Sequence, residues 1–112
     1  MQPYINQTKR NTMKYKIFKK IIQNIINHLD IEYKEMFDES KNPVGVRARQ
    51  LLYYLCNKRG MGVVEIQGYM NKEGHAVNAH STIVYGIDTI KKALSEDSDL
   101  NIITLQLQEI ED

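Results

Sequence analysis

The sequence predicts an all-α fold, a bundle of about six helices that contains a helix-turn-helix. Apolar residues recur at helical spacing along most of the chain, turn-forming residues separate these stretches, and strand-type alternation is weak throughout. With 112 residues, of which 42% are hydrophobic and 26% charged, the chain is long enough for one modest core and too apolar for disorder throughout.

The first predicted helix starts at Thr12 and ends near Leu29. Apolar side chains recur along it at helical spacing while lysine and amide side chains lie opposite, so one side is expected to be buried. The apolar stripe consists of Phe18, Ile21, Ile22, Ile25, Ile26 and Leu29. The lysines, which we interpret as a solvated face, are Lys14, Lys16, Lys19 and Lys20. Residues 1–11 are polar and lack periodicity, so a flexible arm is expected there and a folded domain over residues 12–112.

Two further helices are predicted before Gly60. Asp30 is expected to cap a short one that runs to Phe37, and Pro43, which favours extended geometry at Asn42, separates it from a longer one. The inner face of the longer helix consists of Ala48, Leu51, Leu52 and Leu55, followed by Cys56, which is expected in the core. A second row consists of Arg47, Gln50, Tyr54 and Lys58. This row is either a track for DNA phosphates or a solvated basic face.

Three more helices are predicted in the second half of the chain. A short helix is expected from Val63 to about Met70, and a loop follows it. Asn78 is the expected N-cap of a longer helix that ends at Leu94, and Ser98 is the expected cap of a last amphipathic helix.

The helix that begins near Asn78 has the pattern of a recognition helix, because its apolar residues fall on one side and hydroxyl side chains on the other. The apolar side is formed by Ile83, Ile87, Ile90 and Leu94. Small polar side chains at the N-terminus of such a helix suit entry into the major groove of DNA, while the preceding helix contacts the backbone. A plain helical core has the same pattern, so both interpretations stay open at this point.

The net charge of +1 hides an asymmetry between the two halves of the chain. Residues 1–60 contain 12 lysine and arginine residues against 5 aspartate and glutamate residues, or +7, and residues 61–112 contain 3 against 9, or −6, which together give +1. A DNA-binding surface would therefore draw its cations from the first half. The candidates are Lys41, Arg47, Arg49, Lys58 and Arg59.

Three segments carry a family resemblance. They are Val46-Arg47-Ala48-Arg49-Gln50, Val64-Glu65-Ile66 and His80-Ser81-Thr82-Ile83-Val84-Tyr85-Gly86-Ile87. In this order they resemble the C-terminal DNA-binding domain of DnaA, the bacterial chromosomal replication initiator, whose pattern is Arg-x-Arg-Gln, Pro-Glu-Ile-Gly and Arg-Asp-His-Thr-Thr-Val. The similarity runs from about residue 17 to the C-terminus. It implies a Trp-repressor-like helix-turn-helix domain that binds specific double-stranded DNA, in replication initiation or its regulation.

The resemblance also implies roles for individual residues. Arg49 and Gln50 match residues that bind backbone phosphates, and Lys41 aligns with a loop arginine that enters the minor groove, where a lysine lacks the planar fork of arginine. Residues 80–82 match recognition-helix residues that contact bases and phosphates. The complete set of expected DNA-binding residues is Lys41, Arg47, Arg49, Gln50, Lys58, Asn78, His80, Ser81, Thr82 and Tyr85.

The chain departs from the family pattern in the connection before the recognition helix. Asn78-Ala79 stands where the family has Arg-Asp, so one bidentate base contact, worth about 1–3 kcal/mol of discrimination, is absent and the family's own DNA site is not carried over. Val64 replaces a proline. The connection is also about five residues longer, by comparison with the family. The inserted segment, Lys72 to Val77, either reaches the DNA backbone through Lys72 and His75 or forms a longer surface turn.

Other classes of function have little support in the sequence. The chain lacks a Gly-x-x-x-x-Gly-Lys-[Ser/Thr] segment, metal-ligand spacing around its histidines and a serine in a nucleophile elbow, so no enzyme, cofactor or metal site is expected. No apolar run approaches the length of a membrane span, and a cytoplasmic protein without a membrane partner is expected. The alternative to DNA binding is a helical module that binds a protein through its first or last helix. In either case a monomer or weak dimer is expected.

Overall fold

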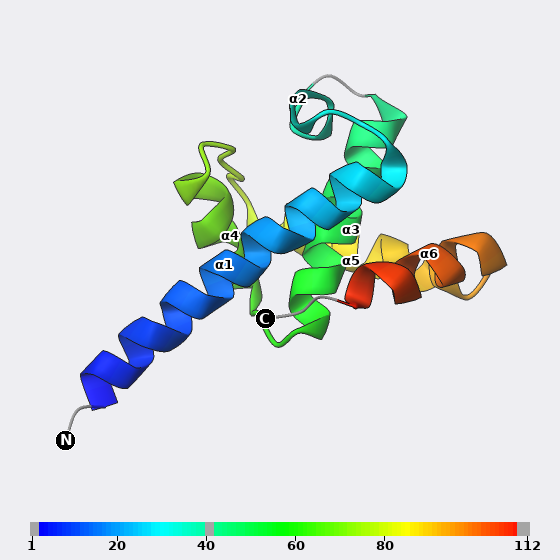
Figure 1. The fold of residues 1–112 in the computed structure, drawn as a ribbon. Coiled ribbons are helices and arrows are strands. Elements are labelled where there is room, and N and C mark those ends of the chain that lie inside the picture. Colours follow the sequence, from blue (N-terminus) through cyan, green and yellow to red (C-terminus); the bar gives the residue numbers. More distant parts are fainter. Residues whose placement is uncertain (1–2, 40–41, 110–112) are drawn as a thin grey trace.

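The computed structural model describes the backbone of residues 3–39 and 42–109 and, within these ranges, the side chains from Met13 onward. Its helices are α1 (Pro3–Leu29), α2 (Tyr33–Met36), α3 (Pro43–Lys58), α4 (Val63–Lys72), α5 (His80–Leu94) and α6 (Ser98–Gln108), as Figure 1 shows. The described ranges contain no strand. The predicted all-α fold with about six helices is therefore confirmed.

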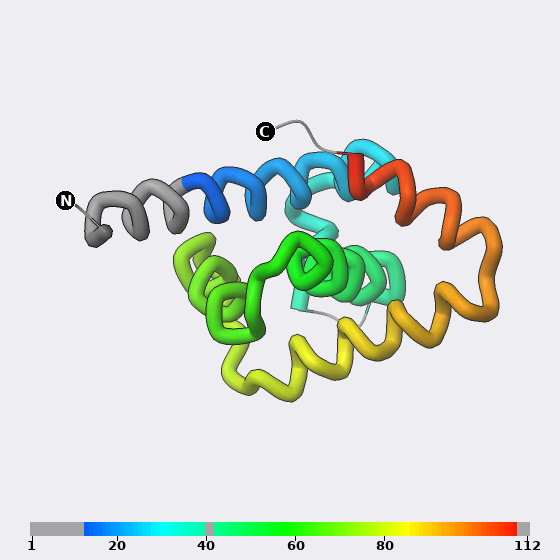
Figure 2. The backbone as a smooth tube through the Cα atoms, turned by 90° about the horizontal axis from the view of Figure 1, so that it is seen from below, coloured from blue at the N-terminus to red at the C-terminus, as the bar shows by residue number. Residues whose placement is uncertain are grey.

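The helix α3 runs through the middle of the bundle. Figure 2 shows it nearly end-on, with α1 on one side and α5 on the opposite side. Every side chain from Leu51 to Cys56 is buried, so this part of α3 is covered around its whole circumference. The prediction that Tyr54 belongs to an outward row is wrong, since its side chain is only 8% exposed. Leu51, Leu52 and Cys56 lie in the core, as predicted.

The stripe predicted for the first helix is buried against α3. Phe18, Ile21, Ile22 and Ile25 are each at most 1% exposed. The helix itself begins at Pro3 rather than at Thr12, so residues 3–11, which the pattern assigns to an arm, have helical backbone. Apolar periodicity detects the buried part of a helix and cannot detect turns that extend beyond it, and a proline suits the first helical position.

The short second helix is capped by Glu32 rather than by Asp30. Asp30 has a φ of 53° and ends α1, and the N–H of Ile31 donates to the carbonyl of Ile26 at 3.1 Å. Aspartate tolerates this left-handed conformation, which closes helices in this way. The N–H of Glu32 in turn donates to a side-chain oxygen of Glu35 at 3.2 Å.

The boundaries of α3 agree with the sequence prediction. The side chain of Asn42 accepts a hydrogen bond of 3.0 Å from the N–H of Val44, and Pro43 occupies the first turn. At the other end Gly60 follows the helix with a φ of 91°, a conformation that favours glycine. Cys56 is buried, which raises the pKa of its thiol.

The predicted caps of the last two helices are wrong by one residue each. Ala79, in extended conformation, precedes α5 in place of Asn78, and Asp97 caps α6 in place of Ser98 by accepting a hydrogen bond of 3.1 Å from the N–H of Leu100. The carboxylate of Asp97 is a good N-cap acceptor, and its negative charge is favoured at the positive end of the helix dipole. Within the described residues, none of the helices combines the length and apolar character needed to cross a bilayer.

Candidate nucleic-acid interface

The candidate interface is built on α4, α5 and the seven residues that connect them, residues 73–79. Helices α4 and α5 pack against each other and against α3. The connection is longer than the three or four residues of a typical helix-turn-helix, so its own contacts decide where α5 begins.

Val77 anchors this connection to α4. The side-chain amide of Gln67 donates to the carbonyl of Val77 at 2.6 Å, and the N–H of Val77 donates to the side-chain oxygen of Asn71 at 3.3 Å. The Val77 side chain is itself buried. These contacts direct the chain into α5 at His80, which explains why the polar Asn78 does not cap the helix.

The histidine of the connection packs against α2. The ring of His75 stacks on that of Phe37 with 3.9 Å between centroids, and its Nε2 lies 2.6 Å from the hydroxyl of Tyr33. Burial lowers the pKa of His75, although the nearby Glu73 opposes this. Of the two alternatives for the inserted segment, a docked surface connection describes His75, while Lys72 belongs to the last turn of α4.

The N-terminal half of α5 presents polar side chains to solvent, as predicted. His80, Ser81 and Thr82 are exposed, and Tyr85, one turn later, is 69% exposed. The opposite side of the helix is buried through Ile83, Gly86, Ile87 and Ile90. The first turn contains no acidic residue and its cap residue has no side-chain hydrogen bond, so the positive end of the helix dipole faces outward.

Close packing at Gly86 sets the position of α5 on α3. A Cβ atom at Gly86 would lie 2.9 Å from Cδ2 of Tyr53 and 3.4 Å from Cγ of Gln50. Contacts this short leave room only for glycine, so the two helices approach closely here. Gln50, an expected phosphate ligand, is therefore half-buried at the contact between α3 and α5.

A hollow of about 340 Å³ lies between α2, α3, the connection and α5. We call it the α3–α5 hollow. It brings together three of the expected DNA-binding residues, Arg49, Asn78 and Thr82. Its lining also includes Phe37, Glu39, Tyr53, Met70, Gly74, His75, Ala76, Val77 and Ala79. Phe37, Glu39 and Tyr53 could not be predicted as lining residues, because their place at the hollow depends on how α2 docks on α3.

Arg49 has a structural role at this hollow. Its Nη1 donates to the carbonyl of Met36 at 2.7 Å and to that of Asp38 at 2.9 Å, which satisfies carbonyl groups at the C-terminal end of α2. The guanidinium thereby ties α2 to α3 at the hollow that Thr82 also lines. Glu39 also lines the hollow, so the charge there is mixed.

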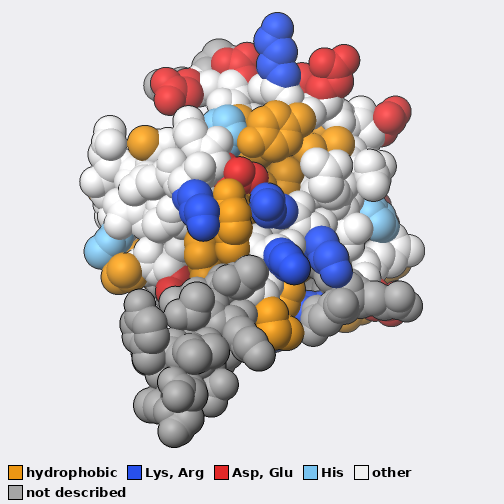
Figure 3. Space-filling model, turned by 60° about the vertical axis from the view of Figure 1, so that its left-hand side comes forward, with side chains coloured by type: hydrophobic (Ala, Val, Ile, Leu, Met, Phe, Trp, Pro, Cys, Tyr) orange, Lys and Arg blue, Asp and Glu red, His pale blue; other side chains and the backbone are white. Residues whose placement is uncertain are grey.

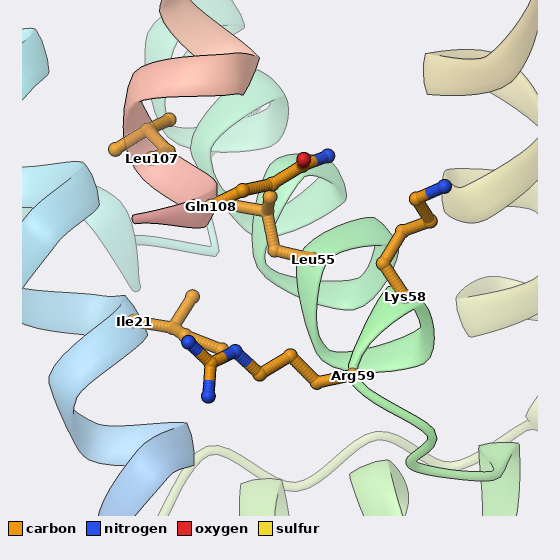
Figure 4. Close-up of a pocket in the computed structure, with 6 residues that line it drawn as sticks. All are labelled: Ile21, Leu55, Lys58, Arg59, Leu107 and Gln108. Carbon is orange, nitrogen blue, oxygen red and sulfur yellow. The ribbon is translucent and has the colours of Figure 1, made fainter. Parts of the chain in front are cut away.

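The other expected cations lie elsewhere. Lys58 is nine residues from Arg49, or about 14 Å along a helix, at the far end of α3. It lines a separate hollow of about 210 Å³ between α1, α3 and α6, where its side chain extends away from Ile21 (Figure 4). Arg47 is half-buried, and its Nη1 is shielded from solvent without a hydrogen-bond partner among the described residues. Lys41 lies outside the described residues.

Within the described part of the chain, no three histidine, cysteine or acidic side chains form a cluster that could hold a metal ion. Comparisons of the chain with protein-family models, with curated proteins and with solved structures found no significant match.

Proposed function

We propose that this chain is a double-stranded DNA-binding domain that inserts the N-terminal half of α5 into the major groove. The observation that carries the proposal is the α3–α5 hollow, which is lined both by Thr82 on the exposed turn of α5 and by Arg49 on α3. A groove-reading helix needs cations beside it that hold the DNA backbone, and Arg49, which also ties α2 to α3, is the candidate for that role here.

The polarity of α5 supports the same proposal. Its first turn offers an imidazole and two hydroxyl groups, and Tyr85 extends the exposed surface by one turn. Hydroxyl groups can form hydrogen bonds with base edges and with phosphates. The backbone N–H groups in the first turn of α5, which have no side-chain cap, attract a phosphate. From the family resemblance described above, we propose that this DNA binding serves replication initiation or its regulation.

Selection of bound sequences from random duplexes tests this proposal. With a selected duplex, Ser81→Ala and Thr82→Ala should weaken specific binding by about 10-fold or more while changing binding to random DNA little, because hydroxyl contacts to base edges carry the discrimination. Ser98→Ala is the matched control, since Ser98 is an exposed serine in the first turn of α6. It should bind like the parent chain. Equal losses on specific and random duplexes, or no enrichment of any sequence, would refute the proposal.

A helical protein-interaction module is the second candidate function, and one observation favours it. On α6, Ile102 is 56% exposed and Leu105 is 61% exposed, beside acidic residues such as Asp99. The first helix is a weaker candidate surface, because its isoleucine stripe is used in the core. A Leu105→Ser variant that binds DNA normally but loses a protein partner would support this second function, and retained partner binding would count against it.

A further inference from the structure

Lysine side chains from two helices meet on the side of the molecule where α1 crosses α4. Figure 3 shows this side, with several Lys and Arg side chains close together around apolar side chains. Lys16 and Lys19 are exposed residues of α1, and Lys72 is an exposed residue of the last turn of α4. We call these three residues the lysine band. On sequence grounds the α1 lysines form only a solvated face, and the contacts below give two members of the band a defined arrangement.

The ring of Tyr15 organises the band. The ammonium groups of Lys19 and Lys72 lie 4.6 Å and 4.3 Å from its centroid. The ring itself is fixed, because it packs at 5.4 Å from the ring of Tyr69 and its hydroxyl donates to Glu73 at 2.9 Å. Cation–π attraction partly offsets the repulsion between the two ammonium groups and favours this arrangement before any partner binds.

The charges of the band are only partly compensated by nearby carboxylates. Glu65 is engaged by Lys14, which lies outside the band, at 3.0 Å. Glu73 accepts the hydroxyl of Tyr15 and supplies one negative charge against the three lysines. The surface therefore favours an anion. Because lysine ammonium groups already lie over the Tyr15 ring, base stacking on that ring is disfavoured and the recognisable groups are phosphates.

Lys72, on α4, is the member of the band that is nearest along the chain to the proposed DNA-binding surface. Gly74 lines the α3–α5 hollow together with Thr82, and Lys72 precedes it by two residues. Two steps of 3.8 Å place the Cα atom of Lys72 within about 8 Å of that of Gly74. Phosphates of one DNA strand recur about every 3.4 Å along the helix axis, so a duplex that extends from α5 towards the end of α4 would bring further phosphates to this point.

We propose that the lysine band binds phosphates of the DNA that flanks the segment contacted by α5, so that the chain contacts a longer stretch of duplex than its recognition helix covers. This inference rests on the proposed function. It adds a second, sequence-independent contact surface on α1 and α4.

Salt dependence of binding to two duplexes tests the inference. One duplex is a selected site trimmed to about 10 base pairs, one turn of DNA, and the other is the same site extended to about 30 base pairs. The test variant replaces Lys16, Lys19 and Lys72 by Gln. The control Lys91→Gln removes a charge from an exposed lysine in the last turn of α5. A second variant with Arg at the three band positions keeps the charges, and thermal melting of each variant shows that it is folded.

Three lost phosphate contacts make the log–log salt slope less negative by about 2.7, so between 50 and 200 mM salt the variant loses about 40-fold less affinity than the parent. We expect this change in salt slope for the triple Gln variant on the long duplex, and little change in its slope on the short duplex. The triple Arg variant and Lys91→Gln should have slopes close to that of the parent. Equal slopes for the parent and the triple variant on the long duplex would overturn the inference while leaving DNA binding by α5 intact. A shift in oligomeric state without DNA would also overturn it, by identifying a second copy as the partner. If the parent binds no duplex, the proposed function fails and the inference fails with it.

Discussion

The contact between α2 and α3 depends on the absence of a side chain at Gly45, and replacement by alanine tests this contact. A Cβ atom at this position would lie 2.6 Å from the carbonyl oxygen of Glu35, whereas real Cβ contacts stay above 3.0 Å. The obstacle is backbone, so α2 has to move by at least 0.4 Å, the difference between these two distances. That movement disturbs the hydrogen bonds from Arg49 to the end of α2.

The expected net effect of Gly45→Ala is a loss of about 1–2 kcal/mol in the free energy of unfolding. Overpacking of this kind costs about 1–3 kcal/mol, and the better helix propensity of alanine returns up to about 1 kcal/mol. For a domain of this size, each 1 kcal/mol lowers the melting temperature by about 4 °C or slightly more.

Gly68→Ala is the matched control for this measurement. Gly68 is an exposed glycine inside α4, and a Cβ atom there meets nothing within 4 Å. It should therefore raise stability by about 0.5–1 kcal/mol through helix propensity alone. Thermal or urea unfolding of both variants measures these changes in the free energy of unfolding. If Gly45→Ala is as stable as the parent chain while Gly68→Ala is stabilised, α2 does not pack on α3 as described.

Three further predictions concern single side chains. Burial lowers the pKa of His75, so protonation favours the unfolded chain, and the stability gained is complete above about pH 6.5 and lost as the pH falls through the lowered pKa. The melting temperature should therefore fall less between pH 7 and pH 5 in His75→Phe than in the parent, and equal falls would contradict this. Asn42→Ala should cost about 1 kcal/mol in urea unfolding, because the helix α3 loses its cap, whereas Asn42→Asp should be nearly neutral. Cys56 is buried with a raised thiol pKa, so iodoacetamide should react with it only as the chain unfolds, and rapid alkylation of the native protein would show an open core.

The helices could be predicted from the sequence because local chemistry marks them. The apolar stripe of α1 and the Asn42-Pro43 start of α3 are local features, and each corresponds to an element of the structure. Gly60 marks the end of α3 for the same reason. Such signals act within a few residues, so the sequence alone contains them.

The remaining features depend on contacts between residues far apart in the chain. The start of α5 is set by Val77, which Gln67 and Asn71 hold against α4, and no local signal specifies this. Arg49 lines the same hollow as Thr82, but its hydrogen bonds to the end of α2 depend on the docking of that helix. The lysine band was missed because Tyr15 and Lys72 meet only in the folded chain.

Chemical-shift mapping with a selected DNA duplex tests most directly whether the N-terminal half of α5 enters DNA beside Arg49. The proposal predicts that the largest amide shifts fall on residues 79–85 and on the rim of the α3–α5 hollow, with the side-chain resonances of Arg49 shifted as well. Residues of α6 should remain near their free positions. Shifts concentrated on α6 around Leu105, or none on residues 79–85, would contradict the proposal.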